Sequence, residues 1–235
     1  MEFKHTRISL TRPITSYSKV QSLISKCIRN RLFHNDKTYL EKKIYLNVGC
    51  GPNTHHDFIN LDYRWHPDID VCWDITKGLP FKNESLKGIF TEHCLEHIPF
   101  ASTDYCLDIF CRILKPGGNI RIVVPDGELY LTKYADIVRG LNRSALPYFS
   151  SDRYGDIYSP IMSVNRIFHS HNHHFIYDYS TVSLLLEKNG FVDIKKECYK
   201  QSRDPRLIID TPQRAVESLY VEASKPWFLC WHNRF

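Results

Sequence analysis

The sequence predicts an α/β fold built on a mostly parallel β-sheet, and three observations carry this prediction. Residues 44–48 are an apolar run of strand composition that ends in a glycine-bearing turn at 49–51. Residues 120–124 are almost continuously apolar, which is typical of a parallel strand buried on both faces. Between these runs, residues 102–114 carry apolar side chains at helical spacing. Strands that alternate with helices in this way favour a parallel sheet covered by helices.

Length and composition are those of one globular domain with room for an insertion. The chain has 235 residues, of which 43% are hydrophobic and 24% charged. No apolar run approaches the roughly 18 residues of a membrane-spanning helix, and the N-terminus lacks the apolar core of a signal peptide. We therefore expect a cytoplasmic protein. Eight cysteines occur without a C-x-x-C pair, which favours reduced, buried thiols over disulfides or a zinc knuckle.

A basic extension, residues 1–43, precedes the body of the protein. It holds ten Lys or Arg and three Asp or Glu, a net charge of +7 against +5 for the whole chain. Such an extension could bind nucleic acid, anionic lipid or an acidic partner, and the alternative that we favour is a solvated leader. Apolar residues at helical spacing predict an amphipathic helix over 16–33, and a homodimer contact is one role open to it.

The elements of the first half can be assigned in order. Strands are expected at 44–48, 58–61, 69–73, 86–91 and 120–124. The helix over 102–114 has candidate N-caps in the Ser-Thr-Asp sequence at 102–104. The Lys-Pro-Gly-Gly sequence at 115–118 should end this helix, with a glycine in a left-handed cap.

The pattern breaks between residues 126 and 179, directly after the last of these strands. Residues 127–138 can be helical, whereas residues 140–168 are rich in Arg, Ser, Tyr and Pro and show no clear period. A long irregular segment in a compact domain is usually a lid or a binding loop. After it we expect a helix over 181–189 that ends at Gly190, strands at 191–199 and 215–223, and packing of Trp227, Phe228 and Trp231 against the body.

The glycine-bearing turn and the acid after it favour a nucleoside-binding site. Gly49 and Gly51 let the backbone approach a ligand closely, because no Cβ is in the way. Asp62, at the end of the second strand, can accept both hydrogen bonds of a ribose diol. A dinucleotide is disfavoured, because the third glycine of G-x-G-x-x-G is absent and too few residues precede the second strand for a normal crossover helix. The pyrophosphate seat at a helix N-terminus is therefore poorly built.

Six short stretches occur in order over residues 46–126: LNVGCGPN, INLD, CWDITKGLPF, IFTEHCLEHI, CRILKPGG and RIVVPD. With them the chain resembles the class I S-adenosylmethionine-dependent methyltransferases, and most closely the small enzymes often associated with sugar and polysaccharide modification. The resemblance implies a Rossmann-like, doubly wound, seven-stranded sheet, mostly parallel, with an antiparallel final hairpin. It also implies a methyltransferase domain at 44–235, a substrate-binding insertion at 126–179, and an N-terminal helix that covers the sheet or closes over the cofactor.

The same resemblance implies a site for the cofactor S-adenosylmethionine at the carboxyl edge of the sheet. The glycine turn and residues 91–93 would contact the methionine part, Asp62 the ribose hydroxyls and Asp74 the adenine amino group. For each acid the structural alternative is a helix cap or a surface turn. Asn47 stands where many of these enzymes carry Asp or Glu, and its amide oxygen can also accept. The expected cofactor-binding residues are Asn47, Gly49, Cys50, Gly51, Asp62, Asp74, Ile75, Thr91, Glu92 and His93.

Histidines form two candidate groups for chemistry. His93 and His97 are four residues apart, as two metal ligands on a helix can be. However, the order is not H-E-x-x-H and the sequence shows no third ligand, so no metal is expected. The second group consists of His169, His171, His173 and His174.

A general base is the most specific role open to the second group. In the resembling subgroup a histidine lies shortly before a Tyr-Asp pair, and here His173 precedes Tyr177 and Asp178. A solvated loop and a zinc or iron site are the alternatives. Asp126, at the end of the fifth strand, is the second candidate base.

These features predict methyl transfer from the sulfonium to a hydroxyl oxygen of a small polar acceptor such as a sugar or glycan, with nitrogen as the second choice. One rival is a nucleic-acid methyltransferase that uses the basic extension. It is disfavoured, because no Asn/Asp-Pro-Pro-Tyr/Phe sequence follows the fourth strand. The other rival is a non-catalytic module that binds the cofactor or a partner protein.

Overall fold

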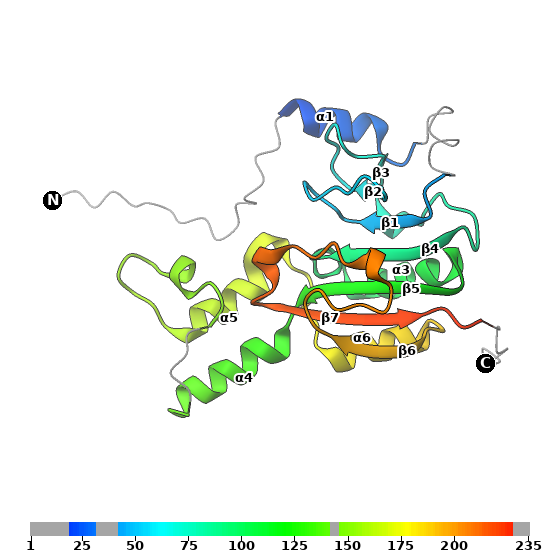
Figure 1. Ribbon diagram of the computed structural model, residues 1–235. Coiled ribbons are helices and arrows are strands. Elements are labelled where there is room, and N and C mark those ends of the chain that lie inside the picture. The colour runs from blue at the N-terminus through cyan, green and yellow to red at the C-terminus, as the bar shows by residue number, and fades with distance from the viewer. Residues whose placement is uncertain (1–18, 32–41, 142–145, 228–235) are drawn as a thin grey trace.

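The structure, a computed structural model, describes residues 19–31, 42–141 and 146–227 (Figure 1). Its centre is a seven-stranded sheet in the order β3-β2-β1-β4-β5-β7-β6. Strand β7 is antiparallel to β5 and β6, and the pairs from β3 to β5 are parallel. The predicted fold class, including the antiparallel final hairpin, is therefore confirmed. The strands are β1 Tyr45–Val48, β2 Ile59–Asp62, β3 Val71–Cys72, β4 Leu86–Glu92, β5 Leu114–Pro125, β6 Val192–Glu197 and β7 Ser218–Ser224.

The connection between β1 and β2 consists of turns, as the short spacing predicts. The α-helices of the described chain are α1 Lys19–Ile28, α3 Phe100–Ile113, α4 Gly127–Val138, α5 Pro160–His169 and α6 Tyr179–Lys188. No helix among the described residues combines the length and apolar character needed to cross a membrane.

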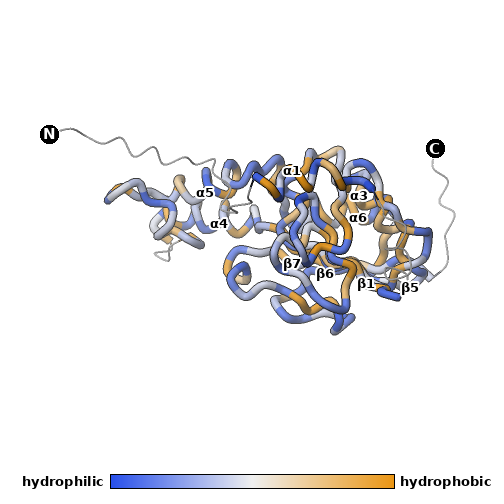
Figure 2. Tube along the Cα trace, turned by 90° about the horizontal axis from the view of Figure 1, so that it is seen from above, coloured by the Kyte–Doolittle hydropathy of each residue, from blue (hydrophilic) through white to orange (hydrophobic). Residues whose placement is uncertain are grey.

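The two faces of the sheet are covered differently. Helices α3 and α6 bury their apolar sides, including Phe110 and Leu186, in the main core against one face. The other face carries Tyr45, Phe90 and Tyr220, and Leu207 from the segment 198–214 packs on it. Figure 1 shows this segment crossing in front of the strands, and Figure 2 shows the apolar colouring concentrated in the sheet and the elements beside it.

A buried arginine holds the segment 198–214 on the sheet. Arg121 of β5 is fully buried, and its guanidinium lies 2.7 Å from Asp210 and 2.9 Å from Glu222. It also donates to the carbonyl oxygens of Cys198 and Gln201. A guanidinium in such a place is tolerated because carboxylates and carbonyls accept all the hydrogen bonds that it loses from water. The almost continuous apolar run of this strand thus contains a buried ionic cluster.

The insertion between β5 and α6 is an ordered helical unit. The expectation that residues 140–168 lack regular structure is wrong for residues 160–168, because α5 begins at Pro160. Tyr130, Leu146, Val164 and Ile167 form a small core between α4 and α5. The unit projects beyond the carboxyl end of β5, to one side of the sheet (Figure 1).

An ion-pair cluster ties this insertion to β7. The Arg166 guanidinium lies 2.8 Å from Asp152 and 3.3 Å from Glu217, which directly precedes β7. The Tyr130 hydroxyl donates to the same Glu217 carboxylate at 2.6 Å. The helices of the insertion are therefore positioned against the sheet, not suspended on a loop.

Both ends predicted for the helix that the structure shows as α3 are wrong. The helix begins at Phe100 with Pro99 as its N-cap, so the Ser-Thr-Asp sequence lies within the first turns. Thr103 is buried there and accepts a hydrogen bond from the Tyr177 hydroxyl at 2.8 Å. At the other end Leu114 already has extended dihedrals, and residues 115–118 belong to β5. Gly117, at φ +72°, lies near the register shift between β4 and β5 and does not cap the helix.

Cysteines and terminal residues agree only in part with expectation. The seven cysteines of the described chain are free thiols, but Cys27 and Cys198 are exposed. Cys230 lies outside the described residues, as do Phe228 and Trp231 and parts of the predicted helix over 16–33. The prediction that Trp227 packs back is wrong in extent, because 74% of its surface is exposed.

Candidate functional site

The glycine turn after β1 is tied to the end of β2. The amide groups of Gly49 and Cys50 donate to the Leu61 carbonyl at 2.8 and 3.2 Å. Gly51 donates from its amide to Asp62 Oδ2 at 2.9 Å. Both glycines have positive φ, +66° for Gly49 and +49° for Gly51, which L side chains rarely adopt. The turn and the acid that the sequence singles out are thus one hydrogen-bonded unit at the carboxyl edge of the sheet.

The glycine turn also packs on the turn after β4. A Cβ placed on Gly49 would collide with Cys94 Sγ and lie 2.6 Å from Cys94 Cβ, whereas one placed on Gly51 would meet open space. Gly49 is therefore required by packing as well as by φ. The carboxyl ends of β1, β2 and β4 come together here, because these strands are neighbours in the sheet.

This difference predicts unequal effects for two alanine substitutions. Gly49→Ala should lower the free energy of unfolding by about 2–4 kcal/mol, since a left-handed alanine is strained and its Cβ overlaps Cys94. Gly51→Ala, the matched control, should cost only the strain, about 1–2 kcal/mol. Urea denaturation measures both values. Equal losses for the two variants would contradict the close approach at Gly49.

Asn47 has a structural role that an acid could not perform. Its buried side-chain amide donates to the Asn53 carbonyl at 2.9 Å and lies 3.4 Å from Asn60 Oδ1. A carboxylate at this position would have no proton to donate to either acceptor. Asn47, in place of the Asp or Glu of many such enzymes, therefore helps to hold the turn at residues 51–53 through this hydrogen bond.

Asp62 is a largely buried carboxylate with acceptor capacity to spare. Its Oδ1 accepts from the Arg64 amide at 2.7 Å, in addition to the Gly51 bond to Oδ2. Desolvation raises the pKa of Asp62, and the two backbone donors oppose this shift. An ionised carboxylate offers about four lone-pair positions, so roughly two are left for a ligand such as a diol.

Asp74 acts as a helix cap, the structural role that the sequence leaves open for it beside cofactor binding. It is the N-cap of the 3-10 turn Ile75–Lys77, and its Oδ1 accepts from the Thr76 amide and hydroxyl at 3.1 and 2.7 Å. Ile75 is buried beneath this turn. The Asp74 amide donates to the side chain of Asn30 at 2.8 Å. A role toward an adenine ring stays a prediction for both residues.

Helix α1 leads to this same edge. Arg29, directly after the helix, stacks over the Tyr63 ring at 3.6 Å and donates to the Tyr63 carbonyl at 2.9 Å. Ser25 accepts from the Trp65 amide at 2.8 Å. The C-terminal part of α1 and Arg29 after it therefore pack on the loop that follows Asp62. Val20 and Leu23 on α1 are exposed, which leaves the predicted homodimer contact open.

Residues 91–93, at the carboxyl end of β4, lie in three different environments. Thr91 is buried, and Glu92 turns its carboxylate to the segment 198–214, where the Thr211 amide donates to it at 2.9 Å. His93 has a positive φ of +49° and its Nε2 lies 2.8 Å from Ser218 Oγ. The Ser218 hydroxyl donates to the Arg214 carbonyl, so its oxygen accepts from His93 Nε2. The neutral His93 ring therefore carries its lone pair on Nδ1.

That Nδ1 faces a buried acid, Glu96, which lies on the 3-10 turn Leu95–His97. The distance from His93 Nδ1 to Glu96 Oε1 is 3.6 Å, and His97 Nε2 lies 3.8 Å from the same oxygen. Glu96 is fully buried, and neither of its carboxylate oxygens has a hydrogen-bond partner. Burial raises the pKa of Glu96 to about 8 and lowers that of His97 to about 4.

The insertion brings His173 to this group. The amide of His174 donates to the Glu96 carbonyl at 2.7 Å, which fixes the two segments together. The His173 ring lies against His97 at 4.8 Å between centroids, and its Nδ1 donates to the Ile167 carbonyl at 2.6 Å. Burial lowers the pKa of His173 to about 4, so its Nε2 carries a lone pair at neutral pH. His169, His171 and His174 are exposed.

Asp126, the other candidate base, is engaged elsewhere. It is the N-cap of α4, and its Oδ1 accepts from the Leu129 amide at 3.1 Å. Its Oδ2 lies 3.7 Å from Lys196 Nζ on β6, the far edge strand of the sheet. The structure thus places Asp126 and His173 in different surroundings, although both belong to the insertion.

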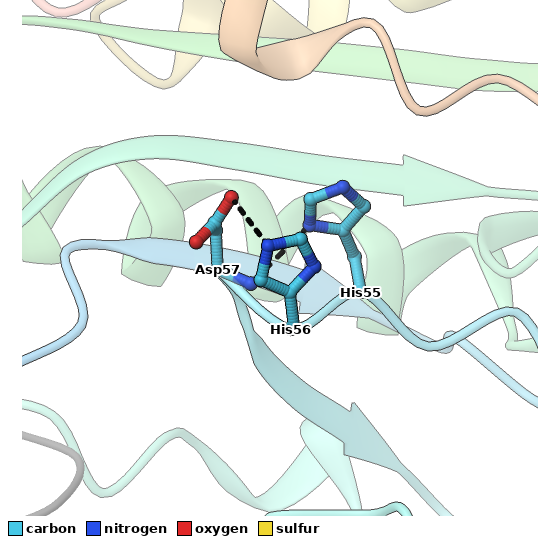
Figure 3. A group of neighbouring side chains, drawn as sticks. All are labelled: His55, His56 and Asp57. Carbon is cyan, nitrogen blue, oxygen red and sulfur yellow. Dashed lines mark hydrogen bonds and ion pairs between the residues drawn. The ribbon is translucent and has the colours of Figure 1, made fainter.

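Two further histidines, next to an aspartate, lie on the connection before β2 (Figure 3). His55, His56 and Asp57 are consecutive, and the two rings stack at 4.7 Å between centroids. His56 Nε2 lies 3.2 Å from Asp57 Oδ2, and both of these side chains are mostly exposed. Because the His56 and Asp57 side chains are open to solvent, their polar atoms do not carry the cost of an unpartnered buried group.

Comparison with known proteins adds similarity at the level of solved structures. No protein-family model and no curated protein match the sequence. Phosphoethanolamine N-methyltransferase 2 of Haemonchus contortus, in complex with S-adenosyl-L-methionine, is 14% identical with a TM-score of 0.43. The match covers 83% of this chain and 53% of that one, so this chain spans about half of its length.

Two further matches have similar scores. A SAM-dependent methyltransferase of Archaeoglobus fulgidus is 16% identical with a TM-score of 0.46, covering 87% of this chain and 94% of that one. A possible histamine N-methyltransferase of Thermotoga maritima is 14% identical with a TM-score of 0.44, covering 77% and 81%. Similarity this low transfers no residue role or substrate to this chain.

Sequence reasoning missed the residues whose partners lie far along the chain. Asn30 at Asp74, Ser218 at His93 and Arg214 near Glu92 have no local pattern that marks them. The sequence also shows no third ligand near His93 and His97, whereas the structure brings His173 there. One signal was available: Glu96 stands between His93 and His97, directly after the strand expected at 86–91.

Proposed function

We propose that this chain is an S-adenosylmethionine-dependent methyltransferase that acts on a hydroxyl oxygen of a small polar acceptor such as a sugar or glycan. The observation that carries the proposal is the hydrogen-bonded unit of the Gly49–Gly51 turn and Asp62 at the carboxyl edge of the sheet. Open α/β sheets bind ligands at this edge. A turn with two glycines, next to a largely buried acid with free lone pairs, suits a nucleoside carrying a ribose diol.

The cofactor would lie along the ends of β1, β2 and β4. Its ribose would be held by Asp62, its adenine by the Asp74 to Lys77 turn, and its sulfonium end would lie by residues 91–93. Arg29 and Tyr63, stacked beside Asp62, would narrow the entrance at the ribose. The protein's main contribution would be to align nucleophile, methyl carbon and sulfur, which can remove several kcal/mol of barrier.

His173 is the better of the two candidate bases. A hydroxyl acceptor is barely ionised at pH 7 and needs a proton acceptor within reach. With Nδ1 donating to the Ile167 carbonyl, the neutral His173 ring offers Nε2 as that acceptor. The Asp126 carboxylate is instead used in capping α4 and in pairing with Lys196.

The insertion 126–179 is the proposed selector of the acceptor. It lies beyond the carboxyl end of β5 and supplies His173. A depression of about 330 Å³ is lined by residues of the insertion and of α6, and its polar side chains include Glu128, Thr132, Asp178 and Thr181. Polar side chains around such a depression can hydrogen-bond a polyol.

Cofactor binding tests the proposal. Titration calorimetry with S-adenosylmethionine or S-adenosylhomocysteine should show binding by the chelator-treated protein. Asp62→Ala should weaken this binding by about 1–3 kcal/mol, roughly 5- to 150-fold, since a buried polar partner is lost. Asp68→Ala is the matched control, because the Asp68 side chain is 76% exposed on the same loop. No binding by the wild type, or equal binding by Asp62→Ala, would remove the proposed site.

Turnover separates an enzyme from a binding module. A screen of sugars and small phenols should release S-adenosylhomocysteine with at least one acceptor class. Cofactor binding without release for any acceptor would favour the non-catalytic rival. Salt-sensitive binding of nucleic acid through the basic extension would favour the other rival.

A further inference from the structure

Glu96, His97 and His173 form a compact group of metal-ligand atoms. One ligand atom from each lies within 4.8 Å of the others. The group joins the turn after β4 to the insertion, and the His174 amide bond to the Glu96 carbonyl holds the two backbones together. It is distinct from the glycine turn and Asp62, where the cofactor is proposed to bind.

The two histidine rings of this group direct their N–H groups to backbone carbonyls, away from Glu96. His173 Nδ1 donates outward to the Ile167 carbonyl, and the His97 ring hydrogen-bonds to the backbone of His171. His93, beside them, is held through Nε2 by Ser218. The free lone pair of His93 Nδ1 lies 3.6 Å from Glu96 Oε1, and His97 Nε2 lies 3.8 Å from the same oxygen. Both oxygens of this carboxylate are buried and have no hydrogen-bond partner. Burying such a carboxylate without a partner is costly.

A cation among these lone pairs removes the cost. A single proton on Glu96 can satisfy one contact and leaves the other acceptors facing one another. A metal ion binds several at once, and ring nitrogens held by outward hydrogen bonds to backbone carbonyls are the usual arrangement around one. We propose that Glu96, His97 and His173 form a binding site for a divalent transition metal ion, with zinc as the best match.

The ligand set decides which metal. Two imidazole nitrogens and one carboxylate suit zinc and its transition-metal neighbours, whereas Mg²⁺ and Ca²⁺ prefer oxygen ligands. Three protein ligands leave a coordination position open, as in catalytic zinc sites. His173 Nε2 cannot hold a metal and accept a proton together, so its role as base applies to the metal-free protein.

Zinc titration of the full, chelator-treated chain tests the site. Calorimetry should show one tight site, and Glu96→Gln or His173→Ala should weaken it on the order of a hundredfold. The matched control is His56→Ala in the exposed group of Figure 3, which should bind zinc as the wild type does. Absence of zinc binding by the wild type, or unchanged binding by both site variants, would overturn the proposal.

Two further measurements keep the test decisive if a variant folds poorly. Zinc should raise the melting temperature of the wild type and not that of Glu96→Gln, because a ligand stabilises only the state it binds. Cobalt substituted into the wild type should give the intense visible bands of a four- or five-coordinate nitrogen and oxygen site. A pale, six-coordinate spectrum or no zinc-dependent shift would contradict the site. Neither readout depends on methyl transfer, so this inference and the proposed function can fail separately.

Discussion

Replacing Arg121 by alanine should lower the free energy of unfolding by about 3–5 kcal/mol, because it leaves two carboxylates buried without their cation. Asp210 and Glu222 lie at 2.7 and 2.9 Å from its guanidinium, and all three side chains are fully buried. Two carbonyl groups of the segment 198–214 lose their donor as well. Chemical denaturation followed by circular dichroism measures the loss. Arg153→Ala, an exposed arginine of the insertion, is the matched control and should leave stability unchanged.

A combined variant separates charge from packing. Arg121→Met together with Asp210→Asn and Glu222→Gln removes the cation and both anions while keeping similar volumes. It should be more stable than Arg121→Ala, because replacing a whole buried ion cluster costs less than breaking it. A combined variant as unstable as Arg121→Ala would show that the hydrogen bonds to Cys198 and Gln201, not the charges, hold the segment in place.

His173→Ala should lower the turnover of the metal-free protein about a hundredfold to ten-thousandfold, the usual effect of removing a positioned base. Its Nε2 carries the lone pair that would take the acceptor proton, while Nδ1 fixes the ring on the Ile167 carbonyl. Cofactor affinity should stay near that of the wild type. The measurement is initial-rate kinetics at saturating cofactor with an acceptor identified in the screen.

The split between kcat and KM distinguishes a base from a residue that only positions the acceptor. Loss of a base lowers kcat, whereas loss of positioning appears mainly in KM. His169→Ala is the control, because this histidine ends α5 and is exposed. Near-wild-type kcat for His173→Ala would end its candidacy as base and leave catalysis to proximity or to the metal-loaded group.

Local pattern and order were enough to predict most of the sheet. The strand runs, the short β1 to β2 connection and the antiparallel final hairpin appear as expected, with ends shifted by a few residues. These features depend on residues close in sequence, where periodicity and turn chemistry act directly. The misplaced start of α3 has a tertiary cause: the Thr103 hydroxyl is buried and accepts a hydrogen bond from Tyr177, a residue far along the chain.

By itself, the sequence determined the fold class, the glycine turn with Asp62, and the position of the insertion, because each is written in neighbouring residues and in their order along the chain. Only the tertiary structure decided that Arg121 is buried with Asp210 and Glu222, and that His173 meets His97 at Glu96. Both groups join segments far apart in sequence. A charged or histidine side chain looks the same in sequence whether water or the protein surrounds it, and folding alone chooses its partners.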